Sequence, residues 1–313
     1  MDPTLTPGSA RVVDPILTEV ARGYMNAELV WPEIFPVVPV GMRGGNIISF
    51  GSESFADIDI RRAPGADVQV IDVGYAGDPY ALVQRAIAGK LPEEIIQEAE
   101  MVPGIDLASL AIATAMKVAS LQIEIAAAAL VNPGNIGAGR TSALVGAAQW
   151  NHADSVPSRA VLQRREEIRR RVGMTPNRLL LSSDVFTALQ TNADVVERIK
   201  YSQRAASVDI TAELLAAYFN VERVIVGRSL KGQAGAFKDI WQNMALLTYS
   251  NVTPLAQMGS PSFGYTYRLR GYPMASPPWW DASKRSWIYP TTTEDTPVIA
   301  GAEAAYLWTN VLA

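Results

Sequence analysis

The run "GIDLASLAIATAMKVASLQIEIAAAALV", residues 104–131, is long, apolar and rich in alanine. Alanine is the best helix former, so the run predicts one continuous helix of roughly 40 Å. Its length and hydrophobicity are also compatible with a membrane span, but Asp106, Lys117 and Glu124 interrupt it. We therefore expect a buried helix, whose small side chains let neighbouring elements approach closely.

The composition is that of a globular protein with a sizeable core. Hydrophobic residues make up 49% of the 313 residues and charged residues 19%. The net charge of -4 disfavours general nucleic-acid binding, which needs clustered lysine and arginine. There is no cysteine, which excludes disulfides and thiolate chemistry. The first residues lack the basic start and apolar run of a signal peptide, so we expect a soluble chain that is made in the cytoplasm.

Upstream of the long run, the sequence predicts a short helix, an extended arm and a hairpin. Asp14 and Pro15 suit the first positions of a helix. "LVWPEIFPVVPV", residues 29–40, is expected to be extended, because each proline disfavours helix at the residue before it. Two strand-like runs then flank the turn "RRAPGAD", residues 61–67. An isolated hairpin is marginal in water, so this one should pack on its own domain or on a neighbour.

Downstream, the pattern changes to alternating helices and strands. "SRAVLQRREEIRRRVG", residues 158–173, predicts a helix in which Glu166 pairs with Arg170, and Glu167 with Arg171. A solvated helix face explains its six arginines better than an interface does. From residue 176 to about 255, short apolar strands alternate with helices, which indicates a compact α/β block.

The segment "SFGYTYRLRGYPMASPPWWD", residues 262–281, has a period of two in its first half. Phe263, Tyr265, Tyr267 and Leu269 fall on one face of the predicted strand, and a set of small and basic residues falls on the other. The other face carries Gly264, Thr266, Arg268 and Arg270. The aromatic run that follows is suited to stacking sugars or bases, but its prolines favour packing of an extended tail or contact with a partner.

No pattern in the chain indicates catalysis, a cofactor or a metal site. The only histidine, His152, lies in a polar loop without cysteine partners. "GNIGAGRT", residues 134–141, has the spacing of a phosphate-binding loop, but Arg140 replaces the lysine and a helix precedes it where a strand is needed. Glu294 and Asp295 fall in "TTTEDTP", which is interpreted as a loop. We therefore predict a protein that is not an enzyme.

The order of these parts resembles the major capsid proteins of tailed bacteriophages, which have the Hong Kong 97 fold. Several stretches are similar to sequences that recur in one branch of this family: "DPILTEVARGYMNAELVWPEIFPVVPV", "RRAPGADV", "VPGIDL", "VERIKY", "SFGYTYRLRGYP" and "SWIYP". The resemblance covers residues 14–310 and implies an α+β chain in five parts. These parts would be an N-terminal arm (1–40), an extended β-hairpin loop (41–91), a peripheral domain with a long spine helix (92–174), an axial α/β domain (175–255), and return strands of the peripheral domain (256–313).

The function implied by the resemblance is assembly of pentamers and hexamers into an icosahedral head that encloses double-stranded DNA. The implied partners are further copies of the chain, a separate scaffolding protein, a portal, a possible decoration protein and weakly bound DNA; the location would be the virion, after assembly in the bacterial cytoplasm. The Lys-Asn cross-link of some relatives is not carried over, because no motif selects one lysine. An encapsulin-type compartment, or more distantly a carbohydrate-binding or enzymatic module, remains an alternative.

Six charged residues are candidates for contacts between subunits: Asp57, Asp59, Arg61, Arg62, Arg268 and Arg270. The first four lie on the predicted hairpin. For the last two, we expect the strand to cover the long helix with Tyr265, Tyr267 and Leu269. Its arginines would then point the opposite way, towards a neighbouring subunit or the shell interior.

Overall fold

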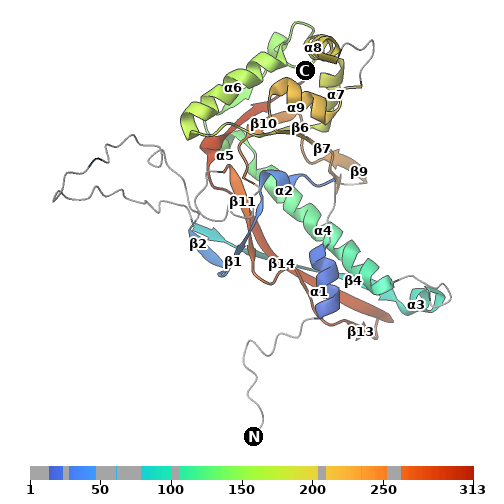
Figure 1. Ribbon diagram of the computed structural model, residues 1–313. Helices are drawn as coiled ribbons and strands as arrows, with labels where there is room; N and C mark the ends of the chain where they lie inside the picture. The colour runs from blue at the N-terminus through green and yellow to red at the C-terminus, as the bar shows by residue number, and fades with distance from the viewer. Residues whose placement is uncertain are drawn as a thin grey trace.

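The computed structural model describes residues 14–23, 28–46, 61, 79–99, 106–203, 209–233, 235–251 and 262–313. Within these residues, helix α4 (Leu107–Leu130) connects two β-sheet layers. Figure 1 shows α4 running from an α/β block, where the C-terminus lies, to the far end of a second sheet. The shape is therefore elongated along α4.

The long helix forms where the alanine-rich run predicted it. The Asp106 side chain accepts a hydrogen bond from the Ser109 N–H at 3.1 Å and caps the first turn. Among the described residues, α4 is the one helix long and apolar enough to cross a membrane. Four of its eight buried side chains instead belong to two core clusters, Ile112 and Met116 to one and Ile123 and Ala127 to the other. The prediction of a buried core helix is confirmed.

One sheet packs against the N-terminal half of α4. Its strands, in spatial order, are β1 (Val37–Val40), β11 (Gly264–Leu269), β14 (Ser286–Ile299) and β12 (Met274–Ala275), and β4 (Val83–Pro92) and β13 (Trp279–Asp281) also pair with β14. Contact with the helix is so close at Gly89 that a Cβ atom there would lie 2.5 Å from the Ala111 carbonyl oxygen. Glycine is required at this point because a side chain would push α4 off the sheet.

The second sheet is the core of the α/β block. Its spatial order is β5 (Thr141–Ala143), β15 (Ala305–Thr309), β10 (Met244–Thr248), β6 (Arg178–Ser182) and β7 (Arg223–Gly227). Leu179 and Leu181 face one core cluster, and Leu180 faces the other. Both faces are covered, which is why these strands are continuously apolar in sequence. The sheet thus draws strands from outside 175–255, while the five domain boundaries stay a prediction.

Helices cover both faces of this block. On one face lie α6 (Pro157–Val172), α7 (Ser183–Thr191), α8 (Ala193–Gln203) and α9 (Ala212–Phe219). On the other lie α2 (Trp31–Ile34) and the C-terminal half of α4. The remaining helices are α1 (Pro15–Gly23), α3 (Glu93–Ala99) and α5 (Pro133–Ile136). Two separate two-stranded ribbons are formed by β2 (Gly44–Asn46) with β3 (Pro79–Ala81) and by β8 (Leu230–Gln233) with β9 (Ala236–Asp239). There are also two 3-10 turns among the described residues, Gly146–Ala148 and Ala302–Ala304.

The arm departs from its prediction at one place. Residues 37–40 are extended as expected, but Trp31–Ile34 form a helical turn. The prediction of extended backbone is wrong there because Pro32 occupies the first turn, where a helix leaves its N–H groups unpaired in any case. Asp14 caps α1 as predicted, accepting from the Leu17 N–H at 3.0 Å.

Candidate functional site

Strand β11 is central in its sheet, as predicted, but its faces are reversed. Tyr265 and Tyr267 pack into a cluster with Val38, Tyr80 and Val298, and no residue of α4 belongs to this cluster. The rings of Tyr80 and Tyr267 stack at 4.4 Å. The expectation that the tyrosines cover the long helix is therefore wrong. Leu269 is only half-buried at the end of the strand.

The opposite face of β11 carries Arg268 and lies on the side of the helices. The Arg268 guanidinium donates to the Asp295 carboxylate at 3.3 Å and lies 5.8 Å from the centre of the Trp31 ring. Arg85 of β4 donates to the same carboxylate at 2.8 Å. Asp295 is fully buried. Burial raises the pKa of Asp295, and the two arginines oppose this rise.

Glu294, on the other face of β14, binds the base of the predicted loop. Its carboxylate accepts two hydrogen bonds from the Arg43 guanidinium, at 2.9 and 3.0 Å, and one from the Tyr272 hydroxyl at 2.9 Å. This geometry raises the pKa of Arg43. Arg43 directly precedes β2, and β2 pairs with β3. The two strands that flank residues 47–78 therefore both lie near this ion pair.

The interpretation of "TTTEDTP" as a loop is wrong, because Glu294 and Asp295 lie in the 14-residue strand β14. Both side chains are almost inaccessible to solvent. Pro290 precedes the segment and Pro297 ends it, and proline is unfavourable in a central strand, whereas the four β-branched threonines of the segment indicated a strand. Adjacent acids in a strand point to opposite faces, and each face supplies arginines.

The six candidate contact residues are placed differently by the structure. Asp57, Asp59 and Arg62 lie outside the described residues, and Arg61 is exposed. Arg270 is exposed in the turn that follows β11. Arg268 is engaged inside the subunit, as described above. Contacts of all six with a second subunit stay predictions.

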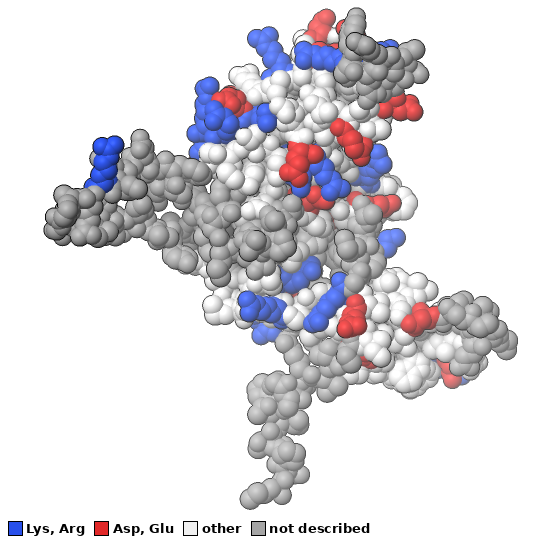
Figure 2. All heavy atoms as spheres, viewed as in Figure 1, with Lys and Arg blue, Asp and Glu red and all other residues white. Residues whose placement is uncertain are grey.

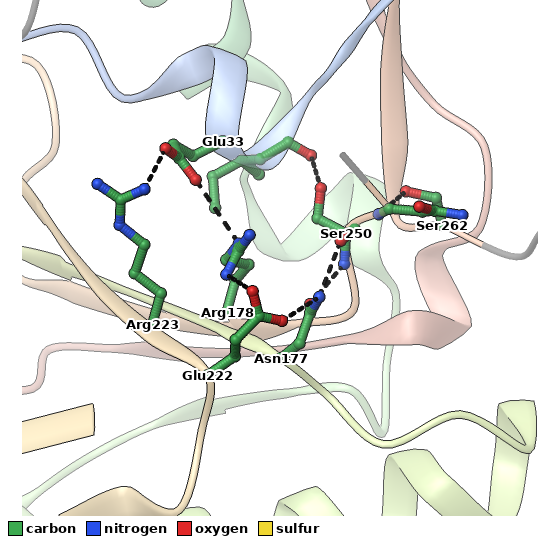
Figure 3. Close-up of polar contacts among 9 residues, drawn as sticks. Glu33, Asn177, Arg178, Glu222, Arg223, Ser250 and Ser262 are labelled. Carbon is green, nitrogen blue, oxygen red and sulfur yellow. Dashed lines mark hydrogen bonds and ion pairs between the residues drawn. The ribbon is translucent and has the colours of Figure 1, made fainter. Parts of the chain in front are cut away.

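A polar cluster ties the arm to the α/β block. Figure 3 shows Glu33 of α2 between two arginines of the block. Its carboxylate lies 2.7 Å from Arg223 and 3.6 Å from Arg178. Arg178 is buried and also contacts Glu222 at 2.8 Å. Ser250 donates to the Ile34 carbonyl at 3.1 Å, which adds a second tie to α2.

A buried carboxylate of α4 completes this junction. Glu124 is fully buried and accepts hydrogen bonds from the Val30 and Trp31 N–H groups, at 3.2 and 2.8 Å. The Ser229 hydroxyl and the Trp241 indole N–H donate to it at 2.9 and 2.5 Å. Glu124 therefore caps α2 and joins it to α4 and to the segments after β7 and β9. Sequence reasoning treated this residue only as a charge that interrupts an apolar run.

An aromatic edge lies at the far end of the first sheet. Trp279, Trp280 and Trp287 are 50, 39 and 38% exposed, and the rings of Trp280 and Trp287 meet at 5.8 Å. The charged residues beside them are paired with one another: Lys284 with Asp281 at 3.1 Å and Arg285 with Glu93 at 2.9 Å. Apart from Lys90, which is exposed on the adjacent strand β4, this surface is aromatic, which is the composition of an interface core. We name these three tryptophans the aromatic edge.

The arginines of α6 are partly neutralised, as predicted. Glu166 pairs with Arg170 at 3.1 Å, and also with Arg169. Glu167 pairs with Arg164 at 2.6 Å, so its predicted pairing with Arg171 is wrong. Figure 2 shows basic side chains gathered over α6, with acidic ones among them.

The two remaining candidates for chemistry are local turns. Residues 134–141 comprise the end of α5, a turn and the first residue of β5, and the Arg140 side chain donates to the Ile136 carbonyl at 2.8 Å. His152 accepts a hydrogen bond from the Asp154 N–H in an exposed turn. Within the described ranges, no group of three or more metal-binding side chains occurs.

Comparisons with known proteins point in one direction. The model of the family "Phage major capsid protein E" matches residues 137–249. The major capsid protein of Burkholderia phage BcepMu is 29% identical over 96% of this chain and 97% of its own. A solved phage-related protein from Bordetella bronchiseptica RB50 is 38% identical over 96% of this chain and 98% of its own, with a TM-score of 0.84. A putative capsid protein of a prophage in E. coli CFT073 shares the fold, with a TM-score of 0.54 and 13% identity over 96% of this chain and 99% of its own.

The two sheets joined by a long helix, together with these matches, define a shell protein of the Hong Kong 97 fold. An encapsulin has the same fold but is a more distant neighbour. The chain belongs to the major capsid proteins of tailed bacteriophages, which form the shell of the phage head. Membership of this family implies a structural role.

Proposed function

We propose that this capsid protein assembles as pentamers and hexamers into an icosahedral head that encloses double-stranded DNA. The observation that carries the proposal is the aromatic edge. Trp280 and Trp287 lie opposite each other and form an aromatic patch on one face of the strand pair, and Trp279 is half-exposed on the other face. Monomeric proteins seldom leave such aromatic surfaces uncovered. A neighbouring copy of the chain removes this surface from water, and such aromatic anchors supply much of the binding energy of an interface.

The loop between β2 and β3 supplies the second part of the proposal. Arg43 and Glu294 fix the base of this loop against β14. We propose that Asp57, Asp59, Arg61 and Arg62 then reach charged groups of an adjacent subunit, and that Arg270 does so from the turn beside the base of this loop, where its N–H donates to the Val40 carbonyl. Exposed ion pairs are worth only about 0–1 kcal/mol each, but a shell repeats each of them many times.

We further propose that the chain has no catalytic role and that a scaffolding protein, a portal and a possible decoration protein join it in the host cytoplasm. The net charge of -4 favours weak, non-specific contact with packaged DNA over tight binding. Salt-dependent association with DNA would therefore be weak for the unassembled subunit.

Electron microscopy and sedimentation of the purified chain, with and without its scaffolding protein, test the proposal. We expect rings, tubes or shells from the wild type, and fewer of them from a Trp280→Ser, Trp287→Ser double variant. Thermal melting of unassembled subunits separates assembly from folding, because these side chains are substantially exposed within one subunit. A wild-type chain that stays monomeric under both conditions would refute the proposal.

A further inference from the structure

The β8–β9 ribbon is a second exposed apolar feature, on the α/β block. Among the described strands, β8 and β9 pair only with each other. Phe237 is 82% exposed and Leu230 is 46% exposed. A two-stranded ribbon is marginally stable alone, and a large aromatic side chain left in water adds nothing to its stability. Figure 1 shows the ribbon projecting from the side of the block near β7.

The pairing register gives the ribbon two chemically different faces. Leu230 lies opposite Asp239, and Gly232 opposite Phe237. Directly paired residues share a face, and so do residues two apart. Leu230, Phe237 and Asp239 therefore form one face, which is aromatic and acidic. No basic side chain among the described residues forms an ion pair with Asp239.

The same block carries an open groove whose lining is apolar and basic, and therefore complementary to the aromatic and acidic face of the ribbon. It has a volume of about 830 Å³ and lies at the start of α6 beside α8, lined by Val156, Ser158, Arg159, Leu162, Gln163 and Arg198. Leu162 is 41% exposed. Arg198 is paired with Asp194 at 2.9 Å, whereas Arg159 forms no ion pair within the described part of the chain. The groove is therefore apolar at Val156 and Leu162 and has an uncompensated cation.

We propose that Phe237 of one copy inserts into the α6–α8 groove of a second copy, with Asp239 facing Arg159. This inference rests on the proposed function and names one contact that would build its rings. The apolar face of the ribbon matches the apolar lining of the groove, and the unpaired carboxylate matches the unpaired guanidinium. A guanidinium over the inserted ring adds a cation–π contact.

The positions of the two surfaces determine the symmetry of the contact. The ribbon follows β7 at one edge of the sheet, whereas the groove belongs to the helical layer. Because the two surfaces are different, the contact is heterologous, and a repeated heterologous contact closes into a ring when its rotation allows. A pentamer or hexamer is such a ring.

Because the chain contains no cysteine, any disulfide in a cross-linking experiment must join introduced cysteines. The Phe237→Cys, Leu162→Cys double variant lacks the anchoring ring, so it is assembled at a concentration well over about tenfold above that which the wild type needs. Oxidised in that state, it should give a ladder of covalent oligomers that ends at the ring size. Each single variant should give no ladder. Disulfide formation requires Cα atoms within about 7 Å, so a ladder reports direct apposition. Dimers alone, or no cross-link in normally formed shells, would overturn the inference.

Truncation of Phe237 tests the apolar part of the contact, and a charge exchange between Asp239 and Arg159 tests its ion pair. Phe237→Ala should raise the concentration needed for assembly at least about tenfold, because truncating an interface anchor has effects of this size. Its subunit melting temperature should match that of Val145→Ala, an equally simple truncation at a 74% exposed site. Asp239→Arg and Arg159→Asp should each impair assembly, and the double variant should recover it.

The outcomes separate this inference from the proposed function. Normal shells from Phe237→Ala, or no recovery in the exchanged double variant, overturn the inference and leave the head-shell proposal intact. A wild-type chain that forms no closed assembly overturns both.

Discussion

Replacing Glu124 by alanine should destabilise the subunit more than any surface substitution in α4. The carboxylate is fully buried and accepts hydrogen bonds from two backbone N–H groups, one hydroxyl and one indole N–H. The Ser229 hydroxyl can rotate to another acceptor, but the other three donors cannot. Each donor left unsatisfied costs about 1–3 kcal/mol, so the loss should be at least about 3 kcal/mol.

Thermal melting of unassembled subunits, followed by tryptophan fluorescence, is the assay. Trp31 and Trp241 both contact Glu124, so the signal reports on this junction. The unfolding entropy of about 2.1 cal/mol/K per residue makes about 3 kcal/mol correspond to a decrease of roughly 5 °C in melting temperature for 313 residues. Glu124→Gln should fall between the wild type and Glu124→Ala, because the amide keeps one acceptor oxygen and turns an N–H₂ group towards donors.

Lys117→Ala is the matched control, because Lys117 is exposed on the same helix. It should melt within a degree or so of the wild type, since exposed substitutions shift stability by less than about 0.5 kcal/mol. If Glu124→Ala melted at the same temperature as Lys117→Ala, the reasoning about the buried junction would be refuted.

Three further predictions concern the loop, the central strand and α6. Arg61→Glu combined with Arg62→Glu should impair shell formation while leaving subunit melting unchanged; normal shells by microscopy would remove the proposed loop contact. Tyr267→Ala should cost about 3 kcal/mol, because the ring is buried and stacks on Tyr80, whereas Arg270→Glu should leave subunit melting unchanged and disturb assembly. Hydrogen bonds from Arg169 and Arg170 lower the pKa of Glu166 from 4.5 to about 2. Its contribution is therefore present above pH 4.5 and lost as the pH falls towards 2, and Glu166→Gln should melt with a weaker pH dependence over that interval.

The sequence alone determined the long helix and the apolar strands of the α/β block. The alanine run predicted α4, and continuous apolar runs predicted β6 and β10, because strands covered on both faces have no polar side. The order of these elements, with the quoted sequence stretches, also indicated the capsid family. These signals are local, and the period and composition of a short window carry them.

Only the tertiary structure decided which face of each element is covered. The alternation of β11 defined two faces, but the sequence does not say on which side α4 lies, and the tyrosines pack away from it. Glu294 and Asp295 resembled loop residues until arginines from β4, β11 and the segment before β2 compensated them. In the sequence, Glu124 is only a charge within an apolar run. In the structure, four donors from distant segments bind its carboxylate. Burial of a charge is stable only when partners satisfy it, and those partners come from residues far away in the chain, which no local pattern encodes.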